Sequence, residues 1–147
     1  MDCRVVLSKE DFLACIKLGE SHYNEVEKAF TGAAYAPKLD TLMQLFDMDM
    51  VSCVGTYNKE GDVVGYVTSV IVPNMFSDVV QGQEFGMYLD PLYRGQGWFK
   101  EMLSVMEEDL YYKGADVMLV TFKKGLAHKL PKGFVEAETS FIKKVEV

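Results

Sequence analysis

A glycine-rich turn that leads into an amphipathic segment is the feature of this sequence best suited to chemistry. The turn is Arg94-Gly95-Gln96-Gly97-Trp98, and a strand predicted over Glu84–Asp90 precedes it. Apolar side chains then recur on one helical face, at Phe99, Met102, Leu103, Met106 and Leu110. A helix N-terminus exposes unpaired N–H groups and the positive end of a dipole, and glycines allow close backbone approach. The turn therefore predicts an anion site suited to a pyrophosphate, or alternatively a structural turn without a ligand.

The composition narrows the class of protein and of partner. The 147 residues, of which 49% are hydrophobic and 25% charged, predict one globular domain over 1–147. Because the sequence has no run of about 18 uncharged apolar residues and no signal-peptide pattern, no membrane partner is expected. The net charge of -7 disfavours nucleic acid as a partner. The same charge suits a cationic substrate, or belongs simply to a solvated surface.

The cysteines give little support to a metal site. Cys3, Cys15 and Cys53 are odd in number and form no CxxC pair, and only His22 and His128 accompany them. We therefore expect no metal. Reduced thiols that behave as small buried hydrophobes predict a cytoplasmic protein.

The remaining segments predict the elements that position the turn. A strand is expected at Arg4–Leu7, and Ser8 has the pattern of a cap that begins a helix. Periodicity and turn residues predict further helices near Glu20–Phe30 and Lys38–Met48, a hairpin of Val51–Tyr57 and Val63–Val72, a strand buried on both faces at Val117–Phe122, a short helix or turn near Leu126–Leu130, and a last strand at Thr139–Val145. This order predicts an α/β fold with a mixed sheet flanked by helices.

Several of these segments, in their order along the chain, resemble the GNAT (Gcn5-related) N-acetyltransferase family. Leu89-Asp-Pro-Leu-Tyr-Arg-Gly-Gln-Gly-Trp-Phe99 is similar to the family's motif A. Val51–Val72 resembles its second and third strands, Gly133-Phe134 with Phe141-Ile-Lys-Lys144 its closing pattern, and Gly19–Glu25 the first-helix region of small phage and bacterial members. The resemblance implies a mixed, mostly antiparallel sheet of six to seven strands flanked by helices, with a strand-loop-helix acyl-CoA site.

The resemblance also implies an activity, the transfer of an acetyl group from acetyl-CoA to a primary amine of a small molecule or protein, without a metal. The backbone of Met87 and Leu89 would hold the pantetheine arm like an added strand, and a free N–H there would stabilise the oxyanion. The pyrophosphate would lie against Gly95, Gln96, Gly97, Trp98, Phe99 and Lys100. Arg94 would contact a phosphate or, alternatively, staple the loop. A homodimer is expected by analogy with many members.

Glu84 is our choice of general base, because some members carry a catalytic Glu near this position. The alternative is a solvated residue at the start of a strand. Simple alternation places Glu84, Gly86, Tyr88 and Asp90 on one face, unless a bulge, common in this strand of the family, shifts the register. His128 and Tyr88 are our choices of general acid. The acceptor is expected between the first helices and the sheet, near His22, Tyr23, Glu25, Tyr35, Asp47 and Asp49.

Two positions depart from the family pattern and leave other functions open. Phe99 stands where Gly or Ala is usual, so its ring either narrows the pyrophosphate site or points into the core. Lys129, preceded by His128, stands where many members have the tyrosine that acts as general acid. Both departures favour a catalytically inactive GNAT-fold structural or interaction protein, for example phage-encoded. A binder that senses acyl-CoA without turnover is the third possibility.

Overall fold

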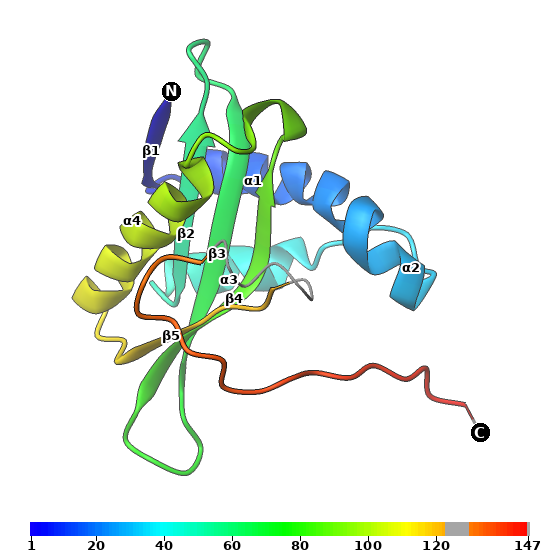
Figure 1. Ribbon diagram of the computed structural model, residues 1–147, viewed down its shortest axis with the longest axis vertical. Helices are drawn as coiled ribbons and strands as arrows, with labels where there is room; N and C mark the ends of the chain where they lie inside the picture. Colours follow the sequence, from blue (N-terminus) through cyan, green and yellow to red (C-terminus); the bar gives the residue numbers. More distant parts are fainter. Residues whose placement is uncertain (123–129, 147) are drawn as a thin grey trace.

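The computed structural model describes residues 1–122 and 130–146, and these contain one five-stranded sheet. The strands, in their order across the sheet, are β1 (Asp2–Val5), β2 (Val51–Tyr57), β3 (Val63–Pro73), β4 (Val80–Leu89) and β5 (Val117–Leu119). The first four pair antiparallel, whereas β4 and β5 pair parallel. The predicted α/β fold with a mixed, mostly antiparallel sheet is confirmed (Figure 1).

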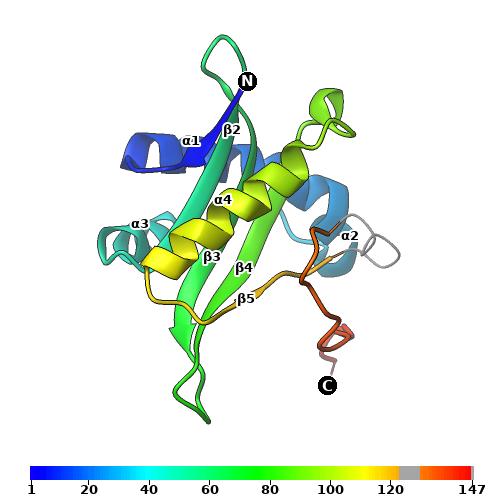
Figure 2. The ribbon, with the colours of Figure 1, turned by 60° about the vertical axis from the view of Figure 1, so that its left-hand side comes forward.

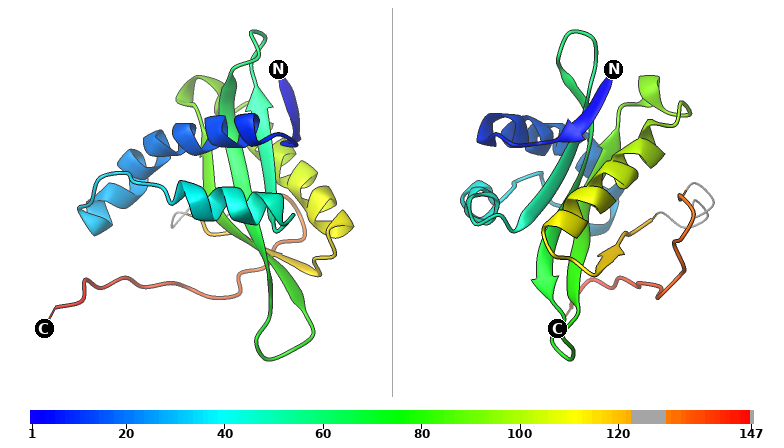
Figure 3. Two further views of the ribbon diagram at one scale, coloured as in Figure 1. Left: turned by 180° about the vertical axis from the view of Figure 1, so that it is seen from behind. Right: turned by 90° about the vertical axis from the view of Figure 1, so that its left-hand side faces the viewer.

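Helices cover both faces of this sheet (Figures 2 and 3). On one face, α1 (Lys9–His22), the π-helix η1 (Tyr23–Glu27) and α2 (Lys28–Thr31) form one uninterrupted helical segment, with α3 (Leu39–Asp47) on the same side. On the opposite face lies α4 (Trp98–Tyr112). The central strand β3 therefore lies between two layers of helix, and β4, which precedes the glycine turn, packs against α1.

Short-range signals explain where these helices begin and end. The predicted cap of α1 is confirmed, because the Ser8 Oγ accepts a hydrogen bond from the Asp11 N–H at 3.1 Å. Gly32 ends α2 in the left-handed conformation, with φ of 67°. The predicted apolar stripe of α4 is buried at Met102, Leu103, Met106 and Leu110.

Two apolar clusters, one on each face, hold the helices to the sheet. On the first face, Phe12 of α1 stacks on Phe46 of α3, with ring centroids 4.8 Å apart. On the second, Leu103 of α4 belongs to the cluster that contains Val54 of β2 and Val67 of β3. Each such buried side chain contributes about 1.5–3 kcal/mol relative to exposure. The central strands are therefore fixed from both sides.

The C-terminal segment differs from the prediction. Thr139–Val145, expected as a strand, forms none, and Phe141 is 94% exposed. This segment lies away from β5 (Figure 1), so its apolar residues have no described strand beside them against which to be buried. The described sheet thus has five strands rather than six to seven. Val117 in the short β5 is also 41% exposed, so burial of that strand on both faces is wrong.

Other sequence predictions have mixed outcomes. The cysteines are all free, and Cys15 and Cys53 are buried. The helix or turn expected near Leu126–Leu130 falls outside the described residues except at its last position. None of the helices within the described ranges is long and apolar enough to cross a membrane.

Candidate functional site

A bulge in β4 determines what this strand presents to each face. Ser69 of β3 pairs with Glu84, and the preceding Thr68 pairs with Gly86, so Phe85 is an extra residue without a partner in β3. Because Thr68 and Ser69 are neighbours in a strand, they and their partners face opposite sides of the sheet. Simple alternation along β4, which places Glu84 and Gly86 on one face, is therefore wrong at this point.

Beyond the bulge, β4 has an open edge. β5 pairs with it only at residues 81–83, and no other described strand lies beside residues 84–89 on that side. The Asp90 N–H donates to β3 at 2.8 Å, so the alternate residues Met87 and Leu89 direct their N–H and C=O groups to the open edge. An extended ligand can therefore pair with the same backbone positions that the sequence singled out.

Two side chains are hydrogen-bonding partners of the backbone carbonyl oxygens of Met87 and Leu89 on this edge. The His22 Nδ1 contacts the Met87 carbonyl oxygen, and the Arg94 Nε donates to the Leu89 carbonyl oxygen at 2.7 Å. Since a carbonyl only accepts, His22 carries a proton on Nδ1, and in the neutral ring Nε2 holds the free lone pair. The N–H groups of Met87 and Leu89 keep their direction toward the edge.

Arg94 fastens the glycine turn to the rest of the site. Its guanidinium donates two hydrogen bonds of 3.1 Å to the two carboxylate oxygens of Glu25 in η1. It also lies 5.5 Å from the centre of the Tyr88 ring. The hydrogen bond to Glu25 raises the pKa of the Arg94 guanidinium. These contacts favour the loop-stapling role over a direct phosphate contact.

The glycine turn follows the 3-10 turn η2 (Pro91–Tyr93) and depends on two left-handed residues. Gly95 has φ of 78° and Gly97 φ of 87°. A Cβ at either position would meet none of the described residues within 4 Å, so backbone conformation, rather than crowding, requires glycine there. Gly97 caps α4, whose N–H groups from Trp98 to Lys100 have no acceptor within the helix. The turn therefore has the open shape and the positive polarity of an anion site.

Phe99 points away from this turn. Its ring lies edge-on to Phe122, with centroids 5.2 Å apart, and both Phe99 and Trp98 pack against the apolar cluster beneath α4. The contacts favour the alternative in which Phe99 is a core residue. The bulky side chain consequently does not argue against a ligand at the glycine turn.

Glu84, at the bulge, is a partly buried carboxyl. Burial, with a smaller effect of the Glu27 charge, raises its pKa from 4.5 to about 7, although a hydrogen bond from the Thr121 backbone opposes the shift. Burial, with a smaller effect of charges that include Glu84, likewise raises the pKa of Tyr66. A carboxyl that titrates near neutrality is suited to accept a proton from an ammonium group.

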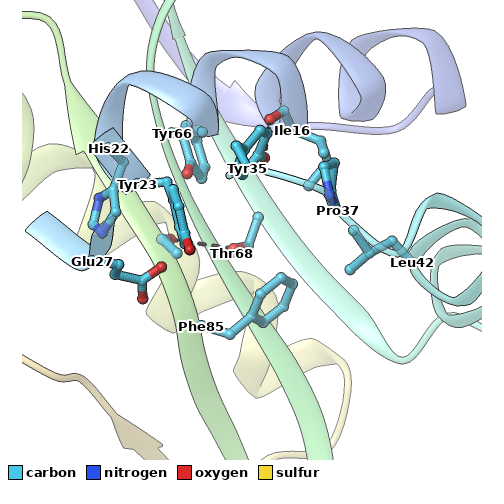
Figure 4. Close-up of a pocket in the computed structure, with 12 residues that line it drawn as sticks. Ile16, His22, Tyr23, Glu27, Tyr35, Pro37, Leu42, Tyr66, Thr68 and Phe85 are labelled. Atoms are coloured by element: carbon cyan, nitrogen blue, oxygen red, sulfur yellow. Dashed lines mark hydrogen bonds between the residues drawn. The ribbon is translucent and has the colours of Figure 1, made fainter. Parts of the chain in front are cut away.

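A pocket of about 170 Å³ opens between the α1–η1 segment and β3–β4 (Figure 4). Its lining is rich in aromatic rings and consists of Ile16, Gly19, His22, Tyr23, Glu27, Tyr35, Pro37, Leu42, Tyr66, Thr68, Phe85 and Gly86. Tyr88 lies beside it, with its ring edge-on to His22 at 6.5 Å between centroids. The pocket thus meets β4 at the bulge and the open edge.

Comparison with known proteins identifies the family. The model of the acetyltransferase (GNAT) family matches residues 20–128. The chain belongs to this GNAT family. No curated protein sequence matches the chain.

Solved structures of acetyltransferases share the fold. An aminoglycoside acetyltransferase, meta-AAC0020, from an uncultured soil metagenomic sample in complex with sisomicin has a TM-score of 0.72 at 16% identity over 99% of this chain and 96% of that one. The Trypanosoma brucei acetyltransferase Tb11.01.2886 has a TM-score of 0.69 at 18% identity, with 98% and 99% covered. A ribosomal-protein-alanine N-acetyltransferase from Brucella melitensis biovar Abortus 2308 has a TM-score of 0.68 at 15% identity, with 99% of both chains covered.

The candidate site gathers only part of the predicted acceptor region. His22, Tyr23 and Tyr35 line the pocket, whereas Asp47 and Asp49 line a separate hollow beside Lys113. His128 lies outside the described residues. Within those residues, no group of three or more potential metal ligands is found.

Sequence analysis placed only His22, Tyr23 and Tyr35 of the lining residues in the acceptor region and missed the others. Glu27 and Phe85 line the pocket, yet neither belongs to a motif. A glutamate two residues after Glu25 on a helix signals nothing locally, and the exposure of Phe85 toward the pocket depends on the bulge. The alternative role of Arg94, by contrast, was predicted from its position in the turn.

Proposed function

We propose that this GNAT protein is an N-acetyltransferase that moves an acetyl group from acetyl-CoA to a primary amine. The observation that carries the proposal is the alignment of an open β4 edge with the anion-binding turn that follows it along the chain. The edge directs the N–H groups of Met87 and Leu89 outward, and α4 begins immediately after the turn. Family membership supports the same reaction.

The residues present fit acetyl-CoA. The open space above Gly95 and Gly97 would receive the pyrophosphate, with the N–H groups of Trp98, Phe99 and Lys100 as donors. The N–H groups of Met87 and Leu89 would donate to carbonyl oxygens of the pantetheine arm and the thioester. When bound, acetyl-CoA supplies an acetyl carbon activated by its bond to sulfur.

Glu84 would act as general base in the transfer. Glu84 is not a lining residue of the pocket, and the bulge turns it to the face of β4 opposite to Gly86, so its carboxylate would take a proton from the acceptor's ammonium through a water and leave a neutral amine. The amine nitrogen then forms a bond to the acetyl carbon while the carbon–sulfur bond breaks. A backbone N–H at the β4 edge would stabilise the charge that develops on the carbonyl oxygen.

The departing sulfur needs a proton, and Tyr88 is our choice of donor among the described residues. Tyr88 lies beside the pocket and against His22. His22, which holds Nδ1–H against the Met87 carbonyl, offers Nε2 as a relay for the proton that the nitrogen loses. His128 stays a prediction, as do the homodimer and the cytoplasmic location.

Calorimetry with acetyl-CoA tests the cofactor part of this proposal. Gly97→Asp should weaken binding by about 100-fold or more, since two like charges about 4 Å apart near a protein surface repel by about 4 kcal/mol. Gly61→Asp is the matched control, because Gly61 has a similar φ of 84° and open surroundings in the β2–β3 hairpin. Equal affinities of the two variants would remove the turn from the site.

A thiol-release assay over a panel of amines then tests the reaction. Acetyl-CoA-dependent release that requires an amine supports an enzyme. Tight binding of acetyl-CoA without release for any amine would favour the acyl-CoA sensor. Absence of binding would favour the structural protein.

A further inference from the structure

The pocket beside β4 has two chemically different ends (Figure 4). We propose that the amine acceptor is a small primary monoamine on a short apolar stem, an alkylamine or arylalkylamine, which inserts its stem between α1 and α3. This inference rests on the proposed function and goes further, because it assigns the class of substrate. It excludes acceptors that carry a second charge on the stem.

The polar end lies next to the reacting edge. His22 and Glu27 meet there, on the α1–η1 segment, with the hydroxyl of Thr68 across from them on β3. Glu27 is the only carboxylate among the lining residues that the structure describes, and none of those residues is a lysine or an arginine. The described part of this end therefore favours an ammonium group. Its position beside the open β4 edge brings that nitrogen to the N–H groups where the thioester is expected.

The apolar end lies on the far side of the aromatic rings. Ile16, Pro37 and Leu42 form it, on α1, the loop before α3 and α3 itself. Tyr35 lies between the two ends, and its hydroxyl donates a hydrogen bond to the Ile16 carbonyl oxygen. With the hydroxyl held there, the Tyr35 ring lines the cavity. The Tyr23 ring lies 5.6 Å from it. A stem in this position therefore meets aliphatic carbon and ring faces, with no described carboxylate at its tip.

Close packing limits the width of the pocket. A Cβ on Gly19 would come within 2.7 Å of the Tyr35 hydroxyl and 2.9 Å of the Tyr66 hydroxyl. A Cβ on Gly86 would come within 3.1 Å of the Thr68 Oγ1. The volume of about 170 Å³ is also below the roughly 300–1,000 Å³ of pockets that enclose drug-sized ligands. The pocket fits a narrow chain or one ring, and not the several rings of an aminoglycoside.

Pentylamine and cadaverine test the inference because they share a five-carbon chain and differ in the distal ammonium. An ammonium at the Leu42 end would lose its hydration without gaining a described partner. We expect kcat/KM for pentylamine to exceed that for cadaverine by about 100-fold or more in the wild-type protein. Similar values, or a preference for cadaverine, would overturn the inference.

Leu42→Glu places a carboxylate at the apolar end and should raise the ratio of cadaverine to pentylamine activity by about tenfold or more. Leu39→Glu adds the same charge to α3 at a residue that is 43% exposed and is not a lining residue, and it should leave the ratio unchanged within about twofold. Thermal melting and acetyl-CoA binding establish that each variant is folded. An unaltered ratio in folded Leu42→Glu protein would count against the inference.

Failure of the inference and failure of the proposed function give different results. Turnover of other amines, with neither five-carbon amine accepted, would overturn the inference and leave the transferase intact. If acetyl-CoA does not bind, the proposed transferase function is wrong. Calorimetric titration of the protein with each of the two amines alone then tests which class of amine the pocket binds. Binding of pentylamine in clear preference to cadaverine supports the assigned class, and any other outcome overturns it.

Discussion

Replacing Glu84 with glutamine separates the catalytic from the structural effect of this carboxyl. Glutamine keeps the shape of the neutral acid but neither ionises nor accepts a proton from an ammonium. In the folded protein, burial first and the Glu27 charge second raise the pKa of Glu84 from 4.5 to about 7. The substitution should therefore lower activity and, at alkaline pH, raise stability.

The size of the stability effect follows from this shift. Between about pH 4.5 and 7 the folded state binds more protons at Glu84 than the unfolded state, so the free energy of unfolding falls as pH rises through this window. The shift from 4.5 to about 7 corresponds to about 3 kcal/mol at most. Glu84→Gln should consequently be more stable than wild type by up to about 3 kcal/mol at pH 8, and nearly equal to it at pH 4.

Urea unfolding at a series of pH values measures this difference, with Glu60→Gln as the control. Glu60 lies in the exposed β2–β3 turn, so its replacement removes one negative charge away from the site. In the thiol-release assay, the wild-type rate should rise with pH around 7, and Glu84→Gln should lose about 100-fold or more in kcat/KM. A variant that is less stable than wild type at pH 8, or a stability difference that does not change with pH, would refute the burial argument. Full activity in Glu84→Gln would refute its role as base.

Two further substitutions test His22 and the core. His22→Asn retains a donor for the Met87 carbonyl but removes Nε2. It should therefore lower kcat by about tenfold or more with little change in melting temperature. An unchanged kcat would show that the role of His22 is purely structural. Leu103→Ala should lower the free energy of unfolding in urea by about 2–5 kcal/mol, because Leu103 is fully buried on the face of α4 that packs against the sheet. Tyr111→Ala, on the same helix at a residue that is 73% exposed, should change it little.

Short-range patterns were sufficient for the elements that carry the site. The hairpin predicted at Val51–Tyr57 and Val63–Val72 is present with one extra residue at its end, because turn residues mark its connection clearly. α4 begins after the glycine turn as predicted. Both features depend on residues that are neighbours in the sequence.

Contacts between residues far apart in the chain could not be predicted from the sequence. Arg94 meets Glu25 across 69 positions, and His22 meets Met87 across 65. The bulge at Phe85 has no local signature, although it reverses the face on which Glu84 lies relative to Gly86. The strand expected at Thr139–Val145 is absent for the same reason, since a segment of this kind forms a strand only where another strand is there to pair with it.

The occupied carbonyls of β4 have a consequence for the solution behaviour of the protein. A neighbouring β-strand needs acceptors as well as donors, and along this edge the acceptors of Met87 and Leu89 are already used by His22 and Arg94. Another chain can therefore not continue the sheet here with a full ladder of bonds, which lowers the tendency toward edge-to-edge aggregation. The N–H groups of Met87 and Leu89 still point to this edge, so a ligand can pair with them through its carbonyl oxygens where a complete β-strand cannot.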